Sequence, residues 1–320
     1  MRCRLGSIAS VAIATVFALV ACSDDGPSGD VDAPVADARP DGTTDGGPDA
    51  MTDAGGIDTP PAADVCTVTA GGTARLIRAG TVLTPTGPLT NGEIRIDAAG
   101  AITCVGASCA MGGETVIACP MGVVSPGLIN THDHITYTQN PPYTDTGERY
   151  EHRHDWRRGL RGHTQINTPG SATADQVRWG ELRMLMGGAT SIVGSGSQAG
   201  LLRNLDSSTN QEGLGQGVVN FETFPLDDAG GAQLTSTCNY GSGADTAATI
   251  MNNASYEPHI SEGIDAVSRN EFLCTSSTTY DTTAPGLSND LVQPQTAIIH
   301  GTGLRPFDYG VMALDGTALI

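Results

Sequence analysis

The sequence predicts an α/β protein with a parallel sheet, preceded by a small all-β module and by a long N-terminal segment without a core. Two observations carry this prediction. From Met121 onward, apolar runs typical of buried strands alternate with runs of helical periodicity, which is the pattern of βα units. Between Ala74 and Ala118, short β-like runs are separated by clusters of Gly, Pro, Asn and Asp, which favour turns.

The expected elements of the α/β part are short and alternate along the chain. Strands are expected over residues 123–131, 190–193, 218–223, 256–259 and 296–300. Helices are expected over residues 174–186, 244–253, 263–273 and 307–314. Thr173 or Asp175 is suited to cap the first of these helices. The last residues, 316–320, have the pattern of a further strand, and the β module has expected strands at 74–78, 92–96 and 101–105.

The N-terminus has the features of an export signal. Arg2 and Arg4 precede an apolar stretch over residues 8–21, which is too short to span a bilayer comfortably. This stretch ends in Leu19-Val20-Ala21-Cys22, which resembles the lipobox of bacterial lipoproteins. The resemblance implies that residues 1–22 are a lipoprotein signal peptide and that Cys22 is lipidated. The protein is then exported and anchored to a membrane, in the periplasm or at the cell surface. An ordinary cleaved signal peptide is the alternative.

Residues 23–64 are expected to form a disordered acidic linker. They contain eleven Asp and one Arg, a net charge of −10 within a chain of net charge −19, and almost no large apolar residue. Such a segment buries too little surface to offset the entropy lost on ordering. As a flexible chain it would span roughly 35 Å. The β module then covers residues 65–120 and the α/β part covers residues 121–320.

The composition excludes several kinds of function. The negative net charge argues against nucleic acid as a partner. All sixteen basic residues are Arg, which excludes a Schiff-base lysine and a carbamylated lysine that bridges two metals. Six cysteines lie beyond Cys22 in a chain expected to be exported, which indicates disulfides, but the sequence does not choose among their pairings. No CxxC spacing is present to favour zinc ligation by cysteine.

The segment over residues 125–134 carries the clearest chemical signal. Alternate side chains of a strand share a face, so His132 and His134 point the same way and Asp133 points the opposite way. Two imidazoles at the C-terminal end of a strand can hold one divalent metal from one side.

The run Pro126-Gly127-Leu128-Ile129-Asn130-Thr131-His132-Asp133-His134 resembles the first-strand signature of the amidohydrolase superfamily. The resemblance covers about residues 70–320 and implies a TIM-like (β/α) barrel preceded by a small β-sandwich segment. Asn91-Gly92-Glu93 and the run over residues 100–106 are similar to the N-terminal part of that sandwich. In such a barrel, the active site lies at the C-terminal ends of the strands.

Two later segments are similar to other parts of the same family's site. Pro258-His259-Ile260-Ser261-Glu262-Gly263 resembles the H-x-A-E segment of the deaminase-like and triazine-hydrolase-like branch, where the His binds metal and the Glu shuttles a proton. Ile298-Ile299-His300-Gly301 resembles the next strand's histidine, which contacts the metal or the developing oxyanion. The resemblance implies His132, His134 and His259 as ligands of one divalent ion, zinc or alternatively iron, and Glu262 and His300 as catalytic residues.

The function implied is hydrolysis of a non-peptide C–N bond in a small molecule, such as a cyclic amide, an amidine or an amino-substituted heterocycle. A divalent ion lowers the pKa of bound water from about 15.7 to about 7, which supplies the attacking hydroxide. Glu262 would then pass a proton to the leaving nitrogen. The alternatives are hydrolysis of lactones or dipeptides on the same scaffold, and a non-catalytic surface lipoprotein or inactive fragment that retains the barrel.

One part of the family's site has no counterpart in the sequence. The family uses an Asp at the end of the last barrel strand, a position that would lie beyond Ile320. We therefore expect an incomplete barrel and a truncated chain, with completion by a partner chain as the less simple explanation. Asp227 and Asp228 follow an expected strand and would lie near the barrel mouth, but neither is assigned as a replacement.

A second HxH, His152-Arg153-His154, lies in a polar, Arg-rich run over residues 148–163. We expect this run to be a solvated loop or helix face. In the alternative interpretation, the run roofs the active site, as loops after the first strand of a barrel do. Arg153 and Arg157 would then bind an acidic group of the substrate.

Overall fold

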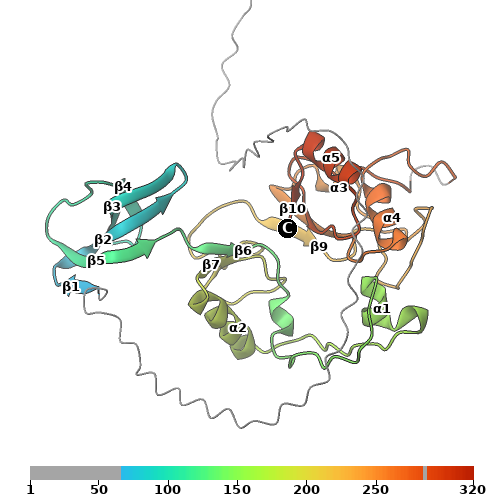
Figure 1. The fold of residues 1–320 in the computed structure, drawn as a ribbon, viewed down its shortest axis with the longest axis horizontal. Helices are drawn as coiled ribbons and strands as arrows, with labels where there is room; N and C mark the ends of the chain where they lie inside the picture. The colour runs from blue at the N-terminus through green and yellow to red at the C-terminus, as the bar shows by residue number, and fades with distance from the viewer. Residues whose placement is uncertain (1–65, 284–286) are drawn as a thin grey trace, which may run out of the picture. The chain divides into compact units, whose positions relative to one another are not determined.

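The computed structural model describes residues 66–283 and 287–320 (Figure 1). Cys22 and the expected linker lie outside these residues, so lipid anchoring stays a prediction. The chain divides into two compact units, of which the first ends at Pro126 and the second runs from Gly127 to Ile320. Within the described residues, no helix is long and apolar enough to cross a membrane.

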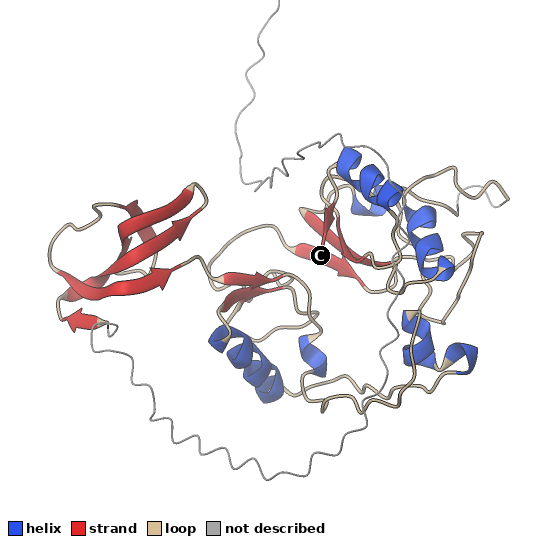
Figure 2. Cartoon of the chain, in the orientation of Figure 1, coloured by secondary structure: helices blue, strands red, loops and turns tan. Residues whose placement is uncertain are grey.

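The first unit is a single five-stranded sheet, drawn in red in Figure 2, with the strand order β1-β5-β2-β3-β4. Its strands are β1 (Thr67–Thr69), β2 (Gly72–Thr84), β3 (Gly87–Ile96), β4 (Ile102–Gly106) and β5 (Glu114–Val124). β2 and β5 pair in parallel, and the other pairs are antiparallel. Ala79, Val82 and Ile94 form its buried core. The strands expected over residues 74–78 and 92–96 lie within β2 and β3, and the strand expected over residues 101–105 is found one residue later, as β4.

The sequence predicted one strand over residues 123–131, and this prediction was wrong. The structure ends β5 at Val124 and begins β6 at Leu128. Pro126 has no backbone N–H to donate to a ladder, so a continuous strand is interrupted there. At Gly127, a Cβ would lie 2.2 Å from Thr190 Oγ1, so the backbone approaches its neighbour more closely than a side chain allows.

The second unit contains parallel strands that follow one another in chain order. The first sheet is β6 (Leu128–Asn130), β7 (Ala189–Ile192) and β8 (Arg203–Asn204); the second is β9 (Val219–Glu222), β10 (Ser255–Ile260), β11 (Ala297–His300) and β12 (Ala318–Leu319). All pairings in both sheets are parallel. The Val219 N–H donates to Leu205 O at 3.0 Å and joins the two sheets. This is the strand sequence of a βα barrel, but among the described residues β6 and β12 are not paired, so no closed barrel is present.

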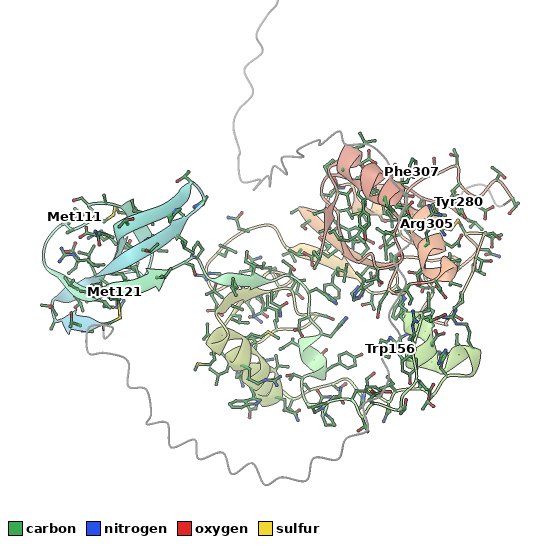
Figure 3. The ribbon with its side chains drawn as sticks, viewed as in Figure 1. Met111, Met121, Trp156, Tyr280, Arg305 and Phe307 are labelled. Atoms are coloured by element: carbon green, nitrogen blue, oxygen red, sulfur yellow. A yellow bond between two sulfur atoms is a disulfide. The ribbon has the colours of Figure 1, made fainter. Side chains whose placement is uncertain are left out.

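Helices connect these strands, as shown by the alternation of blue and red in the second unit (Figure 2). They are α1 (Arg153–Arg158), α2 (Ala174–Met186), α3 (Ala247–Ile250), α4 (Ala266–Thr275) and α5 (Pro306–Asp315). The bounds of α2 are those predicted, and Thr173 is its N-cap, with a side chain that accepts from Gln176 N. Arg305, labelled in Figure 3, is the residue before α5, and its backbone N–H donates to Asp308 Oδ2 at 2.8 Å.

Two predicted helices differ from those observed. The helix expected over residues 244–253 forms only over Ala247–Ile250. The helix expected from residue 263 begins three residues later, at Ala266, because Asp265 is the N-cap and accepts from Ser268 N. Gly263 has φ 156, which is outside the helical region.

Each sheet of the second unit buries one face against helices. Ile260 and Ile298 of the strands pack against Phe272 of α4 and Met312 of α5, and Ile192 packs against Val177 of α2. Because strand side chains alternate, the residues next to these isoleucines point to the opposite face. That face carries the site.

All six described cysteines are paired. The bonds are Cys66–Cys119, Cys104–Cys109 and Cys238–Cys274. The first two lie within the β unit. The third joins the loop after β9 to α4, and both of its cysteines are buried.

Candidate metal centre

Three histidines from distant parts of the sequence meet at the C-terminal ends of parallel strands. His132 and His134 follow β6, and His259 is the penultimate residue of β10. One ring nitrogen from each lies within 4.8 Å of the others. The Nε2 atoms of His134 and His259 are 3.2 Å apart.

The backbone around these residues directs them to one place. Ile260 packs against the helices, so His259 points to the other face of β10. After β6, Asp133 N–H donates to Val193 O at 2.9 Å, and Asp133 Oδ2 accepts from Asn130 Nδ2 at 3.1 Å. Asn130 also contacts Met184 of α2. Asp133 is thus held toward the α2 side, apart from the histidine rings.

His300 joins the histidines through an unusual backbone conformation. Ile298 of the same strand faces the helices, so simple alternation would place His300 there as well. The φ angle of His300 is 75°, in the left-handed region that non-glycine residues rarely adopt. With this turn, the His300 ring centroid lies 5.3 Å from the ring centroids of both His132 and His259.

The three-histidine group fits a divalent metal. Nitrogen ligands at about 2.0–2.1 Å in tetrahedral geometry lie roughly 3.3 Å apart, close to the His134–His259 separation. His259 Nδ1 lies 3.2 Å from Glu222 O. A carbonyl only accepts, so Nδ1 carries the hydrogen and Nε2 has the free lone pair that a metal needs.

The electrostatics of the group favour the neutral, metal-binding form of the rings. Burial, followed by the neighbouring His132, His134 and His300, lowers the pKa of His259 to about 2. Burial and then His134 lower the pKa of His132, and burial lowers that of His134. No carboxylate of the described residues belongs to the group.

The two aspartates considered as neighbours of the site are engaged elsewhere. Asp227 Oδ2 accepts from Gly243 N at 2.9 Å. Asp228 Oδ2 accepts from Arg153 Nη2 at 2.5 Å and from His154 Nε2 at 2.8 Å. The structure therefore places neither aspartate among the three histidines.

Glu262 lies in the loop after β10, beside His300. Its Oε2 is 3.5 Å from His300 Nε2, and its side chain is 24 % exposed. Burial raises the pKa of Glu262 to about 7, against the effect of Arg153 and with a further contribution from Glu271. The carboxyl is thus close to the histidines and can hold a proton near neutral pH.

The second HxH is buried, so the expectation of a solvated face was wrong at residues 152–155, whereas Arg149, Arg158 and Arg161 of the same run are exposed. His152, Arg153, His154 and Asp155 are each at most 2 % exposed. Their partners come from distant segments: His152 Nε2 lies 3.0 Å from Glu271 Oε1, and Asp228 binds His154 and Arg153. Those separations, 119 residues for the first pair and 75 for Arg153 and Asp228, explain why a local charge pattern did not reveal the burial.

The two arginines predicted to bind substrate have different surroundings. Arg153 donates from Nη1 to Thr223 O at 2.7 Å and from Nη2 to Asp228, and is 2 % exposed. Both of its terminal nitrogens are thus bonded to protein groups. Arg157 is half-buried, and its guanidinium carbon lies 4.5 Å from the ring centroid of Phe224. It donates from Nε to His154 Nδ1 at 3.3 Å and from Nη2 to Ala229 O.

Comparisons with known proteins find similarity only at the level of structure. No protein-family model matches the chain, and the search of curated proteins finds no match. Similar solved structures include an adenosine deaminase from Xanthomonas campestris with bound zinc (14 % identity, TM-score 0.39) and an atrazine chlorohydrolase from Arthrobacter aurescens complexed with zinc (15 %, 0.41). An amidohydrolase from Brucella melitensis is a third (14 %, 0.36).

Each alignment covers 77 % of this chain but only 61 % of the deaminase and 64 % of the other two. The chain thus spans less than two thirds of these proteins. TM-scores below 0.5 do not establish a shared fold, so the function proposed below rests on this chain's own residues.

The carboxylate of Asp155, in α1, accepts several hydrogen bonds. It accepts from Arg161 Nε at 2.7 Å, from Gln233 Nε2 at 3.0 Å and from His152 N at 3.0 Å. Burial alone would raise its pKa, but the hydrogen bonds from Arg161 and Gln233 outweigh it and lower the pKa to about 2. Ionised Asp155 therefore stabilises the fold of the α1 segment.

We predict that Asp155→Asn lowers the free energy of unfolding at pH 7 by about 2 kcal/mol, because charge-assisted hydrogen bonds are lost. A carboxylate with a lowered pKa contributes stability above its ordinary pKa of 3.8, and this is lost as pH falls through about 2. The difference between wild type and variant should therefore shrink over that range in denaturant titrations. Asp175→Asn is the control, since that side chain is 93 % exposed; a pH-independent Asp155 effect would contradict the prediction.

Proposed function

We propose that this protein is a metal-dependent hydrolase that cleaves a non-peptide C–N bond in a small molecule. The observation that carries the proposal is the convergence of His132, His134 and His259, with Glu262 and His300 beside them. Three protein ligands leave a coordination position open, which is typical of catalytic rather than structural zinc sites. The resemblance of the HxH and HxSE segments to the deaminase-like branch of the amidohydrolase superfamily supports the same function.

Each residue of the site has a separate role in the proposed reaction. His132, His134 and His259 would hold one zinc or iron ion, and Glu222 O keeps the His259 ring in its binding orientation. When bound, the ion supplies Lewis-acid activation of water and of the substrate carbonyl or amidine carbon. Glu262 takes up a proton and delivers it to the leaving nitrogen. His300, whose Nε2 lies 3.5 Å from Glu262 Oε2, donates a hydrogen bond to the substrate atom on which negative charge develops.

The position of Glu262 favours C–N over C–O cleavage. An amine is a poor leaving group until its nitrogen is protonated, whereas the alkoxide of a lactone depends less on an acid. The Glu262 carboxyl lies beside the metal-binding rings and retains a proton near neutral pH, so it can protonate an amine leaving group. We therefore rank cyclic amides, amidines and amino-substituted heterocycles ahead of lactones as substrates.

The first prediction concerns the metal. Elemental analysis of purified protein should find about one zinc or iron per chain. The double variant His132→Ala/His134→Ala should lose it, because two of the three ligands are removed. His163→Ala is the matched control, since His163 pairs with Glu148 outside the site. Folded wild-type protein that binds no metal after reconstitution would refute the proposed function.

The second prediction concerns the proton carrier. Glu262→Gln keeps the size of the side chain but cannot carry the proton, so kcat should fall by roughly 10²–10⁴-fold while the metal content stays unchanged. The rates would be measured on a panel of cyclic amides, amidines and amino-heterocycles. Glu148→Gln is a control at a partly exposed carboxylate that binds Thr164 and His163. An unaltered kcat in Glu262→Gln would remove Glu262 from the mechanism.

The third prediction concerns substrate charge. We propose that Arg157, rather than the enclosed Arg153, meets an acidic group of the substrate. Arg157→Gln should raise KM roughly 10-fold or more for a substrate that carries a carboxylate, because a charge-assisted hydrogen bond is lost, and should leave KM for its neutral analogue unchanged. Arg158→Gln, at the exposed neighbouring residue, is the control. Equal effects on both substrates would show that Arg157 does not bind an acidic group.

A further inference from the structure

The loop that carries Glu262 has a strained backbone that its neighbours must hold. Ser261 has φ 62 and Gly263 has φ 156. A non-glycine residue in the left-handed region costs of order 1–3 kcal/mol, and persists only where surrounding contacts determine it. The contacts of this loop are therefore part of what places the Glu262 carboxyl.

The N-terminal end of α1 holds this loop from one side. Arg153 N–H donates to Glu262 O at 3.0 Å, and Ile264 N–H donates to Glu151 O at 2.9 Å. His152 and Gly263 face each other in an isolated antiparallel bridge. The segment that precedes α1 thus runs alongside the Glu262 loop.

Glu271 of α4 holds both of these segments. It is 0 % exposed. Its Oε2 accepts from Ser261 N at 2.9 Å, and its Oε1 accepts from His152 Nε2 at 3.0 Å. One carboxylate therefore connects the strained residue of the loop to the segment beside it.

Both contacts require Glu271 to be an acceptor. His152 Nδ1 accepts from His154 N at 3.1 Å and from Gln233 Nε2 at 3.2 Å. The hydrogen of the neutral ring is therefore on Nε2, which donates to Glu271. Ser261 N–H also only donates. A carboxylate meets both donors, whereas an amide turns its NH₂ group against one of them.

We propose that Glu271 is a positioning residue, which holds Glu262 beside His300 by binding the Ser261 amide and the His152 ring at once. Among the described residues, the hydrogen bonds and ion pairs of the Glu271 carboxylate go to Ser261, His152 and Arg153, and none goes to the histidines of the site. The inference rests on the proposed function in one respect, namely that Glu262 carries the proton. Glu271 Oε1 also lies 3.7 Å from Arg153 Nη2, which Asp228 Oδ2 approaches to 2.5 Å.

The test is a variant pair in the full chain. Glu271→Gln keeps the length of the side chain but sets an NH₂ group against one donor. In the double variant His152→Gln/Glu271→Gln, the new residue-152 amide oxygen can accept from that NH₂ group, and the residue-271 oxygen remains free to accept from Ser261 N–H. The match between donors and acceptors is therefore lost in Glu271→Gln and restored in the double variant. Together with His152→Gln and the wild type, these variants form a double-mutant cycle.

Hydrogen–deuterium exchange over residues 258–264 reads the position of the loop without requiring activity. In Glu271→Gln, we expect exchange in this segment to be roughly 10-fold faster. This factor corresponds to the net stabilisation that one hydrogen bond provides. We expect kcat to fall about 10²-fold, as for a misplaced catalytic group, with metal content and KM little changed. The double variant should recover most of both losses relative to His152→Gln.

Glu181→Gln is the matched control. Glu181 is also 0 % exposed and also accepts from two backbone amides, those of Gln198 at 3.1 Å and Leu202 at 3.3 Å. Among the described residues, Glu181 forms no hydrogen bond with the Glu262 loop. Its substitution should lower thermal stability without changing exchange over residues 258–264 or kcat.

The outcomes separate the two proposals. Unchanged exchange in Glu271→Gln, or faster exchange with an unchanged kcat, would overturn the positioning role. A loss without recovery in the double variant would overturn the acceptor argument behind it. If wild-type protein binds no metal and hydrolyses nothing, the proposed function fails, and exchange alone still decides whether Glu271 holds the loop. Should Glu271→Gln not fold, the double variant is compared directly with His152→Gln.

Discussion

The register of β10 between β9 and β11 is the constraint on which the site depends. Side chains alternate between the two faces of a strand, so Ile260 enters the core with Phe272 while His259 faces the other way. A slip of one residue would exchange these two, placing an imidazole among apolar side chains and an isoleucine among the histidines. The same apolar packing that stabilises the sheet therefore selects the orientation of His259, and the Glu222 carbonyl of the neighbouring strand then fixes its ring.

Around this framework, the protein buries an ionic cluster that hydrophobic packing would not require. Arg153, Asp228 and Glu271 come from α1, the loop after β9 and α4, and all are almost fully enclosed. Buried ion pairs gain little net stability, because desolvation offsets attraction, but removal of one partner is costly. Such a cluster restricts the arrangements of the three segments more than it stabilises them. The Cys238–Cys274 disulfide joins the second segment to the third and limits their separation further.

Local sequence signals predicted those parts of the structure that depend on local physics. The bounds and cap of α2 follow from Thr173 and helical periodicity. His132 and His134 come together as strand alternation predicts, although both lie beyond the end of β6. The burial of His152 and His154 depends on carboxylates more than 70 residues away, which a window of sequence does not contain. The two-residue strand β8 has no length over which a pattern can develop. His300 reaches the site through a positive φ, which alternation cannot anticipate.

The two strained residues of the site also support each other. Ser261 and His300 both have positive φ, and they lie at the ends of two adjacent strands: Ser261 directly follows β10, and His300 is the last residue of β11. The turns that follow are bonded together: Gly301 N–H donates to Ile260 O at 3.1 Å, and Thr302 N–H donates to Ser261 O at 3.0 Å. Thr302 Oγ1 also accepts from Gly263 N at 3.0 Å. Because these bonds cross between the strands, a shift of either turn moves the other. The separation of Glu262 and His300 therefore depends on the bonds between these two turns as well as on the contacts that Glu271 makes with Ser261 and His152.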